Sequence, residues 1–129
     1  MLLDSTFLHD LIRNDPDATE RLDTLIETAV PVAVSSLTVF EVGVGLRGGA
    51  AKHREQFRAT VDELEECPLG AAEARRALNI QRALYDRGEP IGAVDVLIAA
   101  TAAERSDATV LTRNVDEFER VEGITVEGY

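Results

Sequence analysis

Short apolar segments alternate with longer stretches of helical periodicity along this chain. The apolar segments are Met1–Leu3, Val30–Val34, Cys67–Leu69, Thr109–Leu111 and Ile124–Val126. Strands that are apolar throughout are typical of parallel sheets, because both faces of such a sheet are covered by helices. The alternation therefore predicts a three-layer α/β sandwich, in which a short, mainly parallel sheet is flanked by helices.

Helical patterns fill the intervals between these segments. They cover Phe7–Ile12, Asp17–Thr28, Leu37–Leu46, Ala50–Glu65, Ala71–Arg87 and Gly92–Arg105. One interval is ambiguous, since the valines in Leu37–Leu46 favour a strand by propensity. Leu37, Phe40 and Val44 nevertheless share a helical face, and Ser36 can cap a helix at its N-terminus. We therefore predict a helix there.

Length and composition limit the class of protein. With 129 residues, of which 45% are hydrophobic, the chain fits one domain spanning residues 1–129. No apolar run approaches the roughly 20 residues that span a bilayer, and no signal-peptide pattern is present. A lone cysteine, Cys67, excludes an internal disulfide and a thiolate zinc site. We expect a cytoplasmic protein that does not enter a membrane.

The charge balance is strongly acidic. Twenty-four acidic residues face 13 basic ones, giving a net charge of −11, and Lys52 is the one lysine among the basic residues. Such a chain is not an obvious nucleic-acid binder, because phosphate contacts contribute most of that affinity. Two interpretations remain open: adaptation to high salt, which screens self-repulsion, or acidic groups gathered at a cation site.

One acid interrupts the most apolar helix. In G-A-V-D-V-L-I-A-A-T-A, from Gly92 to Ala102, Asp95 is the only charged residue. A helix that is apolar nearly all round packs in a core, where an isolated carboxylate is costly unless it is paired, protonated or bound to a metal. Asp95 therefore needs partners elsewhere in the sequence.

Other polar residues follow predicted strands. Asp4 comes directly after the first strand, Glu41 lies in the helix after the second, and Asn114 and Asp116 follow Thr109–Leu111. Ligands of parallel α/β folds bind beyond the carboxyl ends of strands, so these side chains and Asp95 are expected in one pocket.

Each of these residues also has a purely structural explanation. Asp4 could cap the first helix, Thr38-x-x-Glu41 could form a capping box, and Asp95 could interact with a helix dipole. Asn114 could be a turn residue and Asp116 a solvated loop acid. The functional interpretation depends on their joint occurrence.

Clustered carboxylates need a cation in order to stay ionised together, and oxygen ligands suit Mg²⁺ or Mn²⁺. A metal held in this way activates water and neutralises charge on a phosphodiester, which predicts hydrolysis of that bond. His9 and His53 lie in predicted helices without a catalytic motif around them.

Four segments of the chain carry a resemblance to a known family. They are L-L-D-S-T (Leu2–Thr6), S-S-L-T-V-F-E-V-G-V-G-L (Ser35–Leu46), G-E-P-I-G-A-V-D-V-L-I-A-A-T-A (Gly88–Ala102) and V-L-T-R-N-V-D-E-F-E-R-V (Val110–Val121). They resemble the PIN-domain ribonucleases, and most closely the VapC toxins of type II toxin–antitoxin systems. The third segment is the most specific, and the four occur in the order expected for the family. The resemblance covers essentially the whole chain and implies the Rossmann-like PIN fold.

The resemblance also implies a function. It implies a Mg²⁺-dependent endoribonuclease, with Asp4 and Asp95 holding the metal and Glu41 in the same acidic site. Many PIN domains have an acid where this chain has Asn114, so Asn114 or Asp116 completes the site, and a second metal is in question. The resemblance further implies RNA as substrate, a homodimer, and a cognate antitoxin that inserts a basic segment over the acidic pocket.

Arg113 and Arg120 flank the closing segment and are the best candidates for contacts to RNA phosphates. Two other functions remain as alternatives. One is a catalytically inactive PIN-like module that binds RNA or protein, and the other is an acidic receiver-like α/β domain. The receiver fits less well, because here the acid ends the first strand itself and the later acids lie in helices.

Overall fold

The fold is built on one sheet of five short strands. The computed structural model describes residues 1–129 and contains β1 (Leu2–Leu3), β2 (Ala33–Ser35), β3 (Glu65–Cys67), β4 (Thr109–Leu111) and β5 (Thr125–Glu127). Their order across the sheet is β3-β2-β1-β4-β5, and every neighbouring pair is parallel. The predicted mainly parallel sheet is therefore confirmed, and it contains no antiparallel strand.

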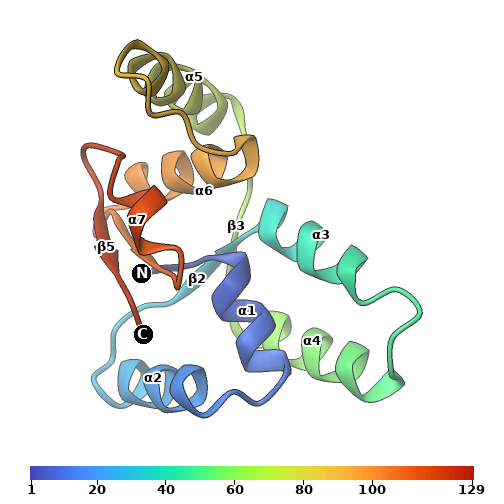
Figure 1. Ribbon diagram of the computed structural model, residues 1–129. Helices are drawn as coiled ribbons and strands as arrows, with labels where there is room; N and C mark the ends of the chain where they lie inside the picture. The colour runs from blue at the N-terminus through green and yellow to red at the C-terminus, as the bar shows by residue number, and fades with distance from the viewer.

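Seven helices surround this sheet (Figure 1). They are α1 (Ser5–Ile12), α2 (Pro16–Glu27), α3 (Ser36–Gly45), α4 (Ala51–Glu63), α5 (Ala71–Asp86), α6 (Ala93–Ala103) and α7 (Val115–Phe118). Gly88 follows the C-cap of α5 with a φ of +70°, a left-handed conformation that favours glycine at the end of a helix. None of the helices combines the length and the apolar content that crossing a bilayer requires.

The pleat of the central strands divides the core between two faces. Leu2 and Val110 pack in the larger apolar cluster with residues of α5 and α6, whereas Leu3 and Leu111 pack with residues of α1 and α2. All four side chains are fully buried. Alternate residues of each strand thus point to opposite helical layers, which explains why these strands are apolar throughout.

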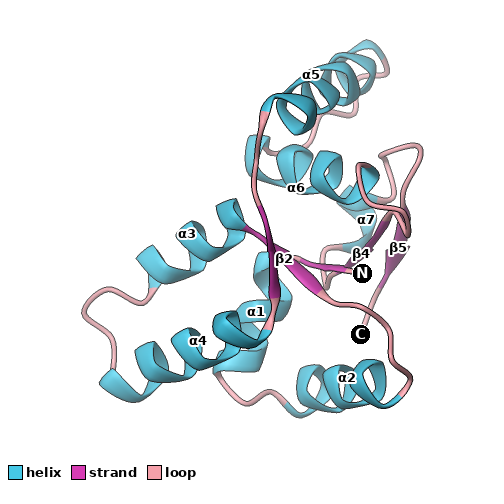
Figure 2. Cartoon of the chain, turned by 180° about the vertical axis from the view of Figure 1, so that it is seen from behind, coloured by secondary structure: helices cyan, strands magenta, loops and turns pink.

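Helices α3 and α4 extend away from the sheet as a pair joined by a loop (Figures 1 and 2). Gly43 lets them approach closely, because a Cβ at this position would lie 3.2 Å from the ring of Phe57 on α4. The predicted helix over Leu37–Leu46 is confirmed, although Ser35, and not Ser36, accepts the capping hydrogen bond, from the Leu37 amide.

Two local predictions were wrong. The third strand is Glu65–Cys67, not Cys67–Leu69, and the helix before it ends at Glu63. β3 lies at the edge of the sheet with Glu65 and Glu66 exposed, so it does not have the apolar character used to find strands. The short helix α7 was not predicted, because one turn is too short to show a periodic pattern.

Candidate active site

The polar residues predicted at strand ends lie next to the point where the order of strands reverses, between β1 and β4. From β1 the chain crosses to β2 on one side, and from β4 it crosses to β5 on the other. β1 and β4 are neighbours, and the amide of Asp4 donates to the carbonyl of Leu111 over 3.2 Å. A crevice beyond the carboxyl ends of such a strand pair is the usual ligand site of this architecture.

Asp4 is a buried carboxylate with three protein donors. Its side chain is 1% exposed. Oδ2 accepts from the hydroxyl of Thr112 at 2.5 Å, and Oδ1 accepts from the hydroxyl of Thr6 at 2.6 Å and the amide of Phe7 at 3.1 Å. Asp4 therefore does cap α1, as its structural explanation required. A carboxylate offers about four acceptor positions, so one on Oδ2 remains for a further ligand.

Burial raises the pKa of Asp4 above its ordinary value, and the hydrogen bonds from Thr112, Thr6 and Phe7 only partly offset this. The three donors stabilise the charged form, whereas the surrounding apolar atoms favour the neutral one. A positive charge beside Asp4 would remove the remaining penalty.

Asp95 lies in the first turn of α6 and is half-buried. Burial raises its pKa to about 6, together with a hydrogen bond and charge repulsion from Glu117 and charge repulsion from Asp4 and Glu41. Three acids from three other parts of the chain therefore act on Asp95. Asp4 and Glu41, which the sequence grouped with Asp95, thus lie close enough for their charges to act on it. The cluster carries negative charge that no basic side chain offsets.

Asn114 links two of these acids. Its side-chain amide donates to Glu117 at 3.0 Å and to Asp95 at 3.4 Å, while its backbone amide donates to the Thr112 hydroxyl at 2.8 Å. Asn114 precedes α7 without capping it through its side chain. Its position is therefore explained by contacts within the acidic cluster.

Asp116 does not join this cluster. Its side chain is exposed, and the neighbouring residue Glu117 takes the place that the sequence assigned to it. Because α7 begins at Val115, the helical turn brings the third residue after Asn114 back toward it and directs the second one away.

Glu41 lies on α3, partly exposed, close enough for its charge to act on Asp95. The alternative capping box is not formed, because Ser35 caps α3 and the hydroxyl of Thr38 has no hydrogen-bond partner.

The two arginines proposed for RNA contacts have different surroundings. Arg113 donates to Asp10 at 2.6 Å and to Asp15 at 3.0 Å, and its guanidinium lies 4.4 Å from the ring centre of Tyr129. The hydrogen bond to Asp10 raises the pKa of Arg113. Arg120 donates to the carbonyl of Pro90 at 3.3 Å and pairs with no carboxylate. Arg120 is therefore the freer of the two for an anionic ligand.

The donor set fits a hydrated divalent cation. No three His, Cys, Asp or Glu side chains stand close enough together to ligate one ion directly. Mg²⁺, however, takes only one or two carboxylates and keeps several waters, which further acids can hold. The free acceptor position on Asp4 and the raised pKa of Asp95 match that requirement.

Three participants were missed at the level of sequence: Thr6, Thr112 and Glu117. Both threonines lie within the segments that carry the family resemblance, one directly after β4 and one near the start of α1. Their proximity to the predicted acids was an available signal, but hydroxyls at strand ends are too common to single out alone.

Comparisons with known proteins identify the family. The model of the PIN domain family matches residues 1–124. A curated relative, "Ribonuclease VapC19" from Mycobacterium tuberculosis, is 34% identical over 121 residues, which cover 91% of this chain and 90% of the relative.

Two solved structures are similar in fold. VapBC2 from Rickettsia felis, bound to a DNA fragment from its promoter, aligns with a TM-score of 0.87 at 23% identity, covering 99% of this chain and 97% of that one. A member of the VapBC family of toxin–antitoxin systems, VapBC-5 from Mycobacterium tuberculosis, aligns with a TM-score of 0.65 at 26% identity, covering 98% and 94%.

Proposed function

Because the chain belongs to the PIN-domain family, we propose that it is a metal-dependent endoribonuclease and the toxin of a toxin–antitoxin pair in the cytoplasm. The observation that carries the proposal is the acidic cluster of Asp4, Asp95, Glu41 and Glu117 at the carboxyl ends of β1 and β4. The similarity to a ribonuclease over most of both chains supports RNA as substrate.

Mg²⁺ is the cation we propose, with Mn²⁺ as the alternative, because all the donors are oxygens. Asp4 and Asp95 would hold it, with Glu41 and Glu117 in reach of its water shell. When bound, the ion would activate water and offset the charge on the scissile phosphodiester.

The chain's own residues prepare the site for this chemistry. Thr112 and Thr6 fix both oxygens of Asp4, and the amide of Asn114 holds Asp95 and Glu117 together. A site whose groups are oriented before the substrate binds needs little rearrangement during the reaction, which is the main source of electrostatic catalysis. Asp95 must lose its proton to act, and the pKa of about 6 leaves it charged at neutral pH.

We further propose a cognate antitoxin and a second copy of this chain as partners. The likeness to a toxin–antitoxin structure supports the first. For the second, Phe40 and Val44 on α3 and Leu78 and Tyr85 on α5 are exposed by 42–68% of their surface. Each pair lies on one face of its helix, and exposed apolar faces of this kind support the proposal of protein contacts.

The test is cleavage of a mixture of transfer, messenger and ribosomal RNA, with Mg²⁺ or with EDTA. Purified wild-type chain should cleave only with Mg²⁺, and Asp95→Asn should reduce the rate about 10²–10³-fold, as expected when a group that acts in the transition state is lost. Well-folded wild type that cleaves none of the RNAs would favour the inactive binding module. Cleavage that survives Asp95→Asn would contradict the assignment of the site.

A further inference from the structure

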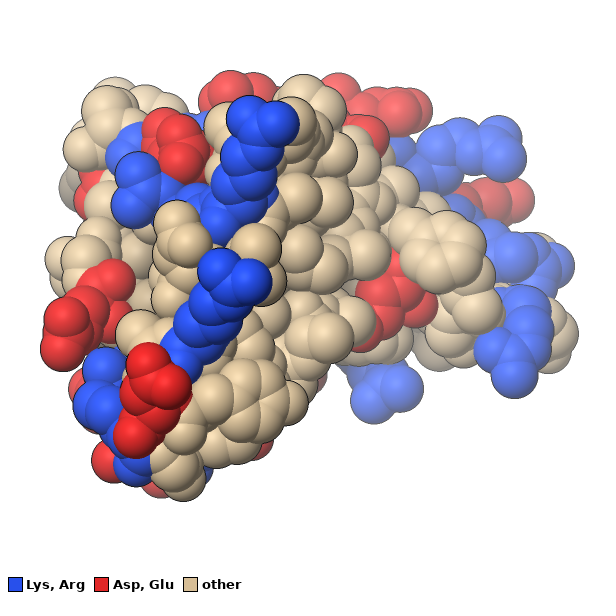
Figure 3. Space-filling model, turned by 90° about the horizontal axis from the view of Figure 1, so that it is seen from above, with Lys and Arg blue, Asp and Glu red and all other residues tan.

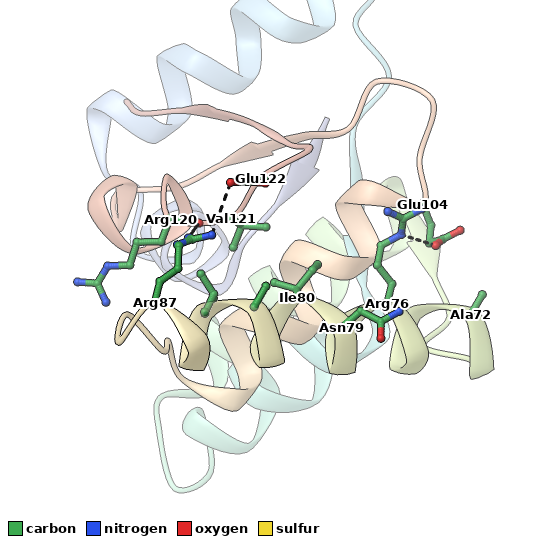
Figure 4. A pocket seen from close by; sticks show the side chains of 11 residues that line it. Ala72, Arg76, Asn79, Ile80, Arg87, Glu104, Arg120, Val121 and Glu122 are labelled. Atoms are coloured by element: carbon green, nitrogen blue, oxygen red, sulfur yellow. Dashed lines mark hydrogen bonds and ion pairs between the residues drawn. The ribbon is translucent and has the colours of Figure 1, made fainter.

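A second concave site lies beside α5, away from the acidic cluster. It is a cavity of about 580 Å³ between α5 and the segment that follows α7 (Figure 4). Ligand sites of small molecules have volumes of about 300–1,000 Å³. The cavity is thus large enough for a single nucleotide.

Basic groups gather at this cavity although the chain as a whole carries −11. Arg76, Arg87 and Arg120 line it together with Glu104 and Glu122. Arg76 is neutralised by Glu104 at 2.6 Å. Arg87 lies 3.6 Å from Glu122, whose side chain is 91% exposed and therefore well screened by solvent. The end of the cavity near Arg87 and Arg120 is thus the least neutralised.

The side chain of Arg87 is held against the backbone of Arg120. Arg87 donates through its guanidinium to the carbonyl of Arg120 over 2.6 Å. Figure 4 shows both residues at the same end of the cavity, with the Arg87 guanidinium turned toward Glu122 and the Arg120 side chain extending the other way. Viewed from the α5 end, basic side chains project from the surface with acidic ones beside them (Figure 3). Each arginine offers a planar fork of donors that suits a phosphate, so the two can contact successive phosphates of a strand.

The rest of the cavity offers a surface for a base. Ile80, Ala83, Leu84 and Val121 provide apolar walls, and Asn79 adds an amide that can donate and accept hydrogen bonds. Apolar walls with one amide suit an unstacked base, which needs van der Waals contact on its faces and polar partners at its edge.

The cavity is connected to the acidic cluster through a short segment. Arg120 donates to the carbonyl of Pro90, and the chain runs from Pro90 through Gly92 directly into α6, which carries Asp95. Arg120 also follows α7, which carries Glu117. A strand of RNA whose phosphodiester lies at the acids can therefore continue toward Arg120.

We propose that this cavity binds one unpaired nucleotide of the RNA substrate, with its two flanking phosphates at Arg87 and at Arg120 and its base against Ile80, Ala83 and Val121. The proposal rests on the proposed function for its choice of RNA. It gives the enzyme a contact that reads a base outside the scissile bond, and so a source of preference among single-stranded sequences.

The first experiment is an NMR titration of the full chain in EDTA with adenosine and uridine 5′-monophosphate. Amides near Ile80, Ala83 and Val121 should shift with nucleotide concentration. Ala83→Met, which fills the cavity without a change of charge, should remove these shifts. Arg75→Gln, a loss of charge on the same helix outside the cavity, should keep them. Shifts confined to the acidic cluster, or none, would overturn the proposal.

The second experiment measures affinity for a single-stranded RNA of 12 nucleotides in the uncleaving Asp95→Asn background. Arg87→Gln combined with Arg120→Gln should weaken binding about tenfold or more and lower the salt dependence, since two phosphate contacts are lost. Arg75→Gln should change affinity less than about threefold. Equal affinity of the double variant and its parent would contradict the proposal.

The two proposals fail separately. Wild type that cleaves no RNA, but whose cavity amides shift with nucleotide, would refute the endoribonuclease and leave the nucleotide site standing. Wild type that cleaves RNA, with cavity amides that do not respond, would refute the nucleotide site alone.

Discussion

Thr112 donates a 2.5 Å hydrogen bond through its hydroxyl to the carboxylate of Asp4, across 108 positions of the sequence. The same hydroxyl accepts from the amide of Asn114 at 2.8 Å. One side chain at the end of β4 therefore fixes both the acid that ends β1 and the start of the segment that carries Glu117.

Replacement of Thr112 by valine keeps the shape of the side chain and removes this hydroxyl. We expect a loss of about 2 kcal/mol in unfolding free energy, because a buried carboxylate and a backbone amide each lose a partner. We also expect roughly tenfold slower RNA cleavage, measured at saturating Mg²⁺.

The matched control is Thr109→Val. Thr109 lies on the same strand, but its hydroxyl donates to the carbonyl of Asp107, outside the acidic cluster. This variant should keep the cleavage rate of the wild type. Equal rates for Thr112→Val and Thr109→Val would show that Thr112 does not position Asp4.

The raised pKa of Asp95 should make the stability of the protein fall as the pH rises. Its pKa is raised to about 6 in the folded chain, so between about pH 4 and 6 the folded state retains a proton that the unfolded state has released. Asp95 therefore lowers stability as the pH rises through this window. In EDTA at pH 7.5, Asp95→Asn should be more stable than wild type by up to about 1 kcal/mol, after allowance for solvent screening.

Thermal melts of both proteins at pH 4 and pH 7.5 provide the measurement. The advantage of Asp95→Asn should be much smaller at pH 4, where the wild-type carboxyl is protonated in the folded state and about half protonated in the unfolded state. Mg²⁺ should raise the melting temperature of the wild type at pH 7.5 and much less that of Asp95→Asn. An Asp95→Asn variant that is less stable than wild type at pH 7.5 in EDTA would contradict the raised pKa.

Glu117 and Asp116 are adjacent acids with opposite expectations. Glu117→Gln should lower the pKa of Asp95 toward its ordinary value, because a charge next to Asp95 is removed. It should also slow cleavage about tenfold through weaker attraction of the cation. Asp116→Asn changes an exposed side chain, so the pKa of Asp95 should stay the same and the cleavage rate should change by less than about twofold.

The pKa of Asp95 can be followed by the carbon chemical shift of its carboxyl in an NMR titration without metal. If Asp116→Asn shifts the titration of Asp95 more than Glu117→Gln does, Asp116 acts on the site as the sequence predicted. That result would contradict the assignment of Glu117 to the acidic cluster.

Arg113 is expected to contribute to stability. Its guanidinium bridges Asp10 on α1 and Asp15 before α2, and packs on Tyr129 at the other end of the chain. Arg113→Gln should lower the melting temperature at low salt, and the difference from wild type should shrink in 1 M NaCl, because exposed ion pairs are screened. The KM for RNA should stay unchanged; a strongly raised KM with unchanged melting would instead support the phosphate contact predicted from the sequence.

The sequence was enough to predict those site residues whose positions depend on the order of strands and helices. Asp4 directly follows a strand and Asp95 interrupts an apolar helix, so the rule for parallel sheets was enough to place them together. The choice between Asp116 and Glu117 depends on where a single helical turn begins, which no periodic pattern reveals. The ion pairs of Arg113 join segments remote in sequence, and no local feature indicates such a contact.

The same limit applies to the edge of the sheet. Apolar character located β1 and β4, which are buried, but failed for β3, whose Glu65 and Glu66 face solvent. A strand at the edge is specified by pairing with β2, where Ser35 is opposite Cys67, and not by its own composition.

The order of strands has a consequence for how the chain acquires its activity. β1 is synthesised first, yet it lies at the centre of the sheet and pairs with β2 and with the late strand β4. Strand pairs this distant in sequence form slowly, because a long loop must close before any contact is gained. A nascent chain carries Asp4 from the start but cannot assemble the acids until β4 and α7 have emerged. The proposed nuclease is thus inactive while the segments that precede β4 are being synthesised.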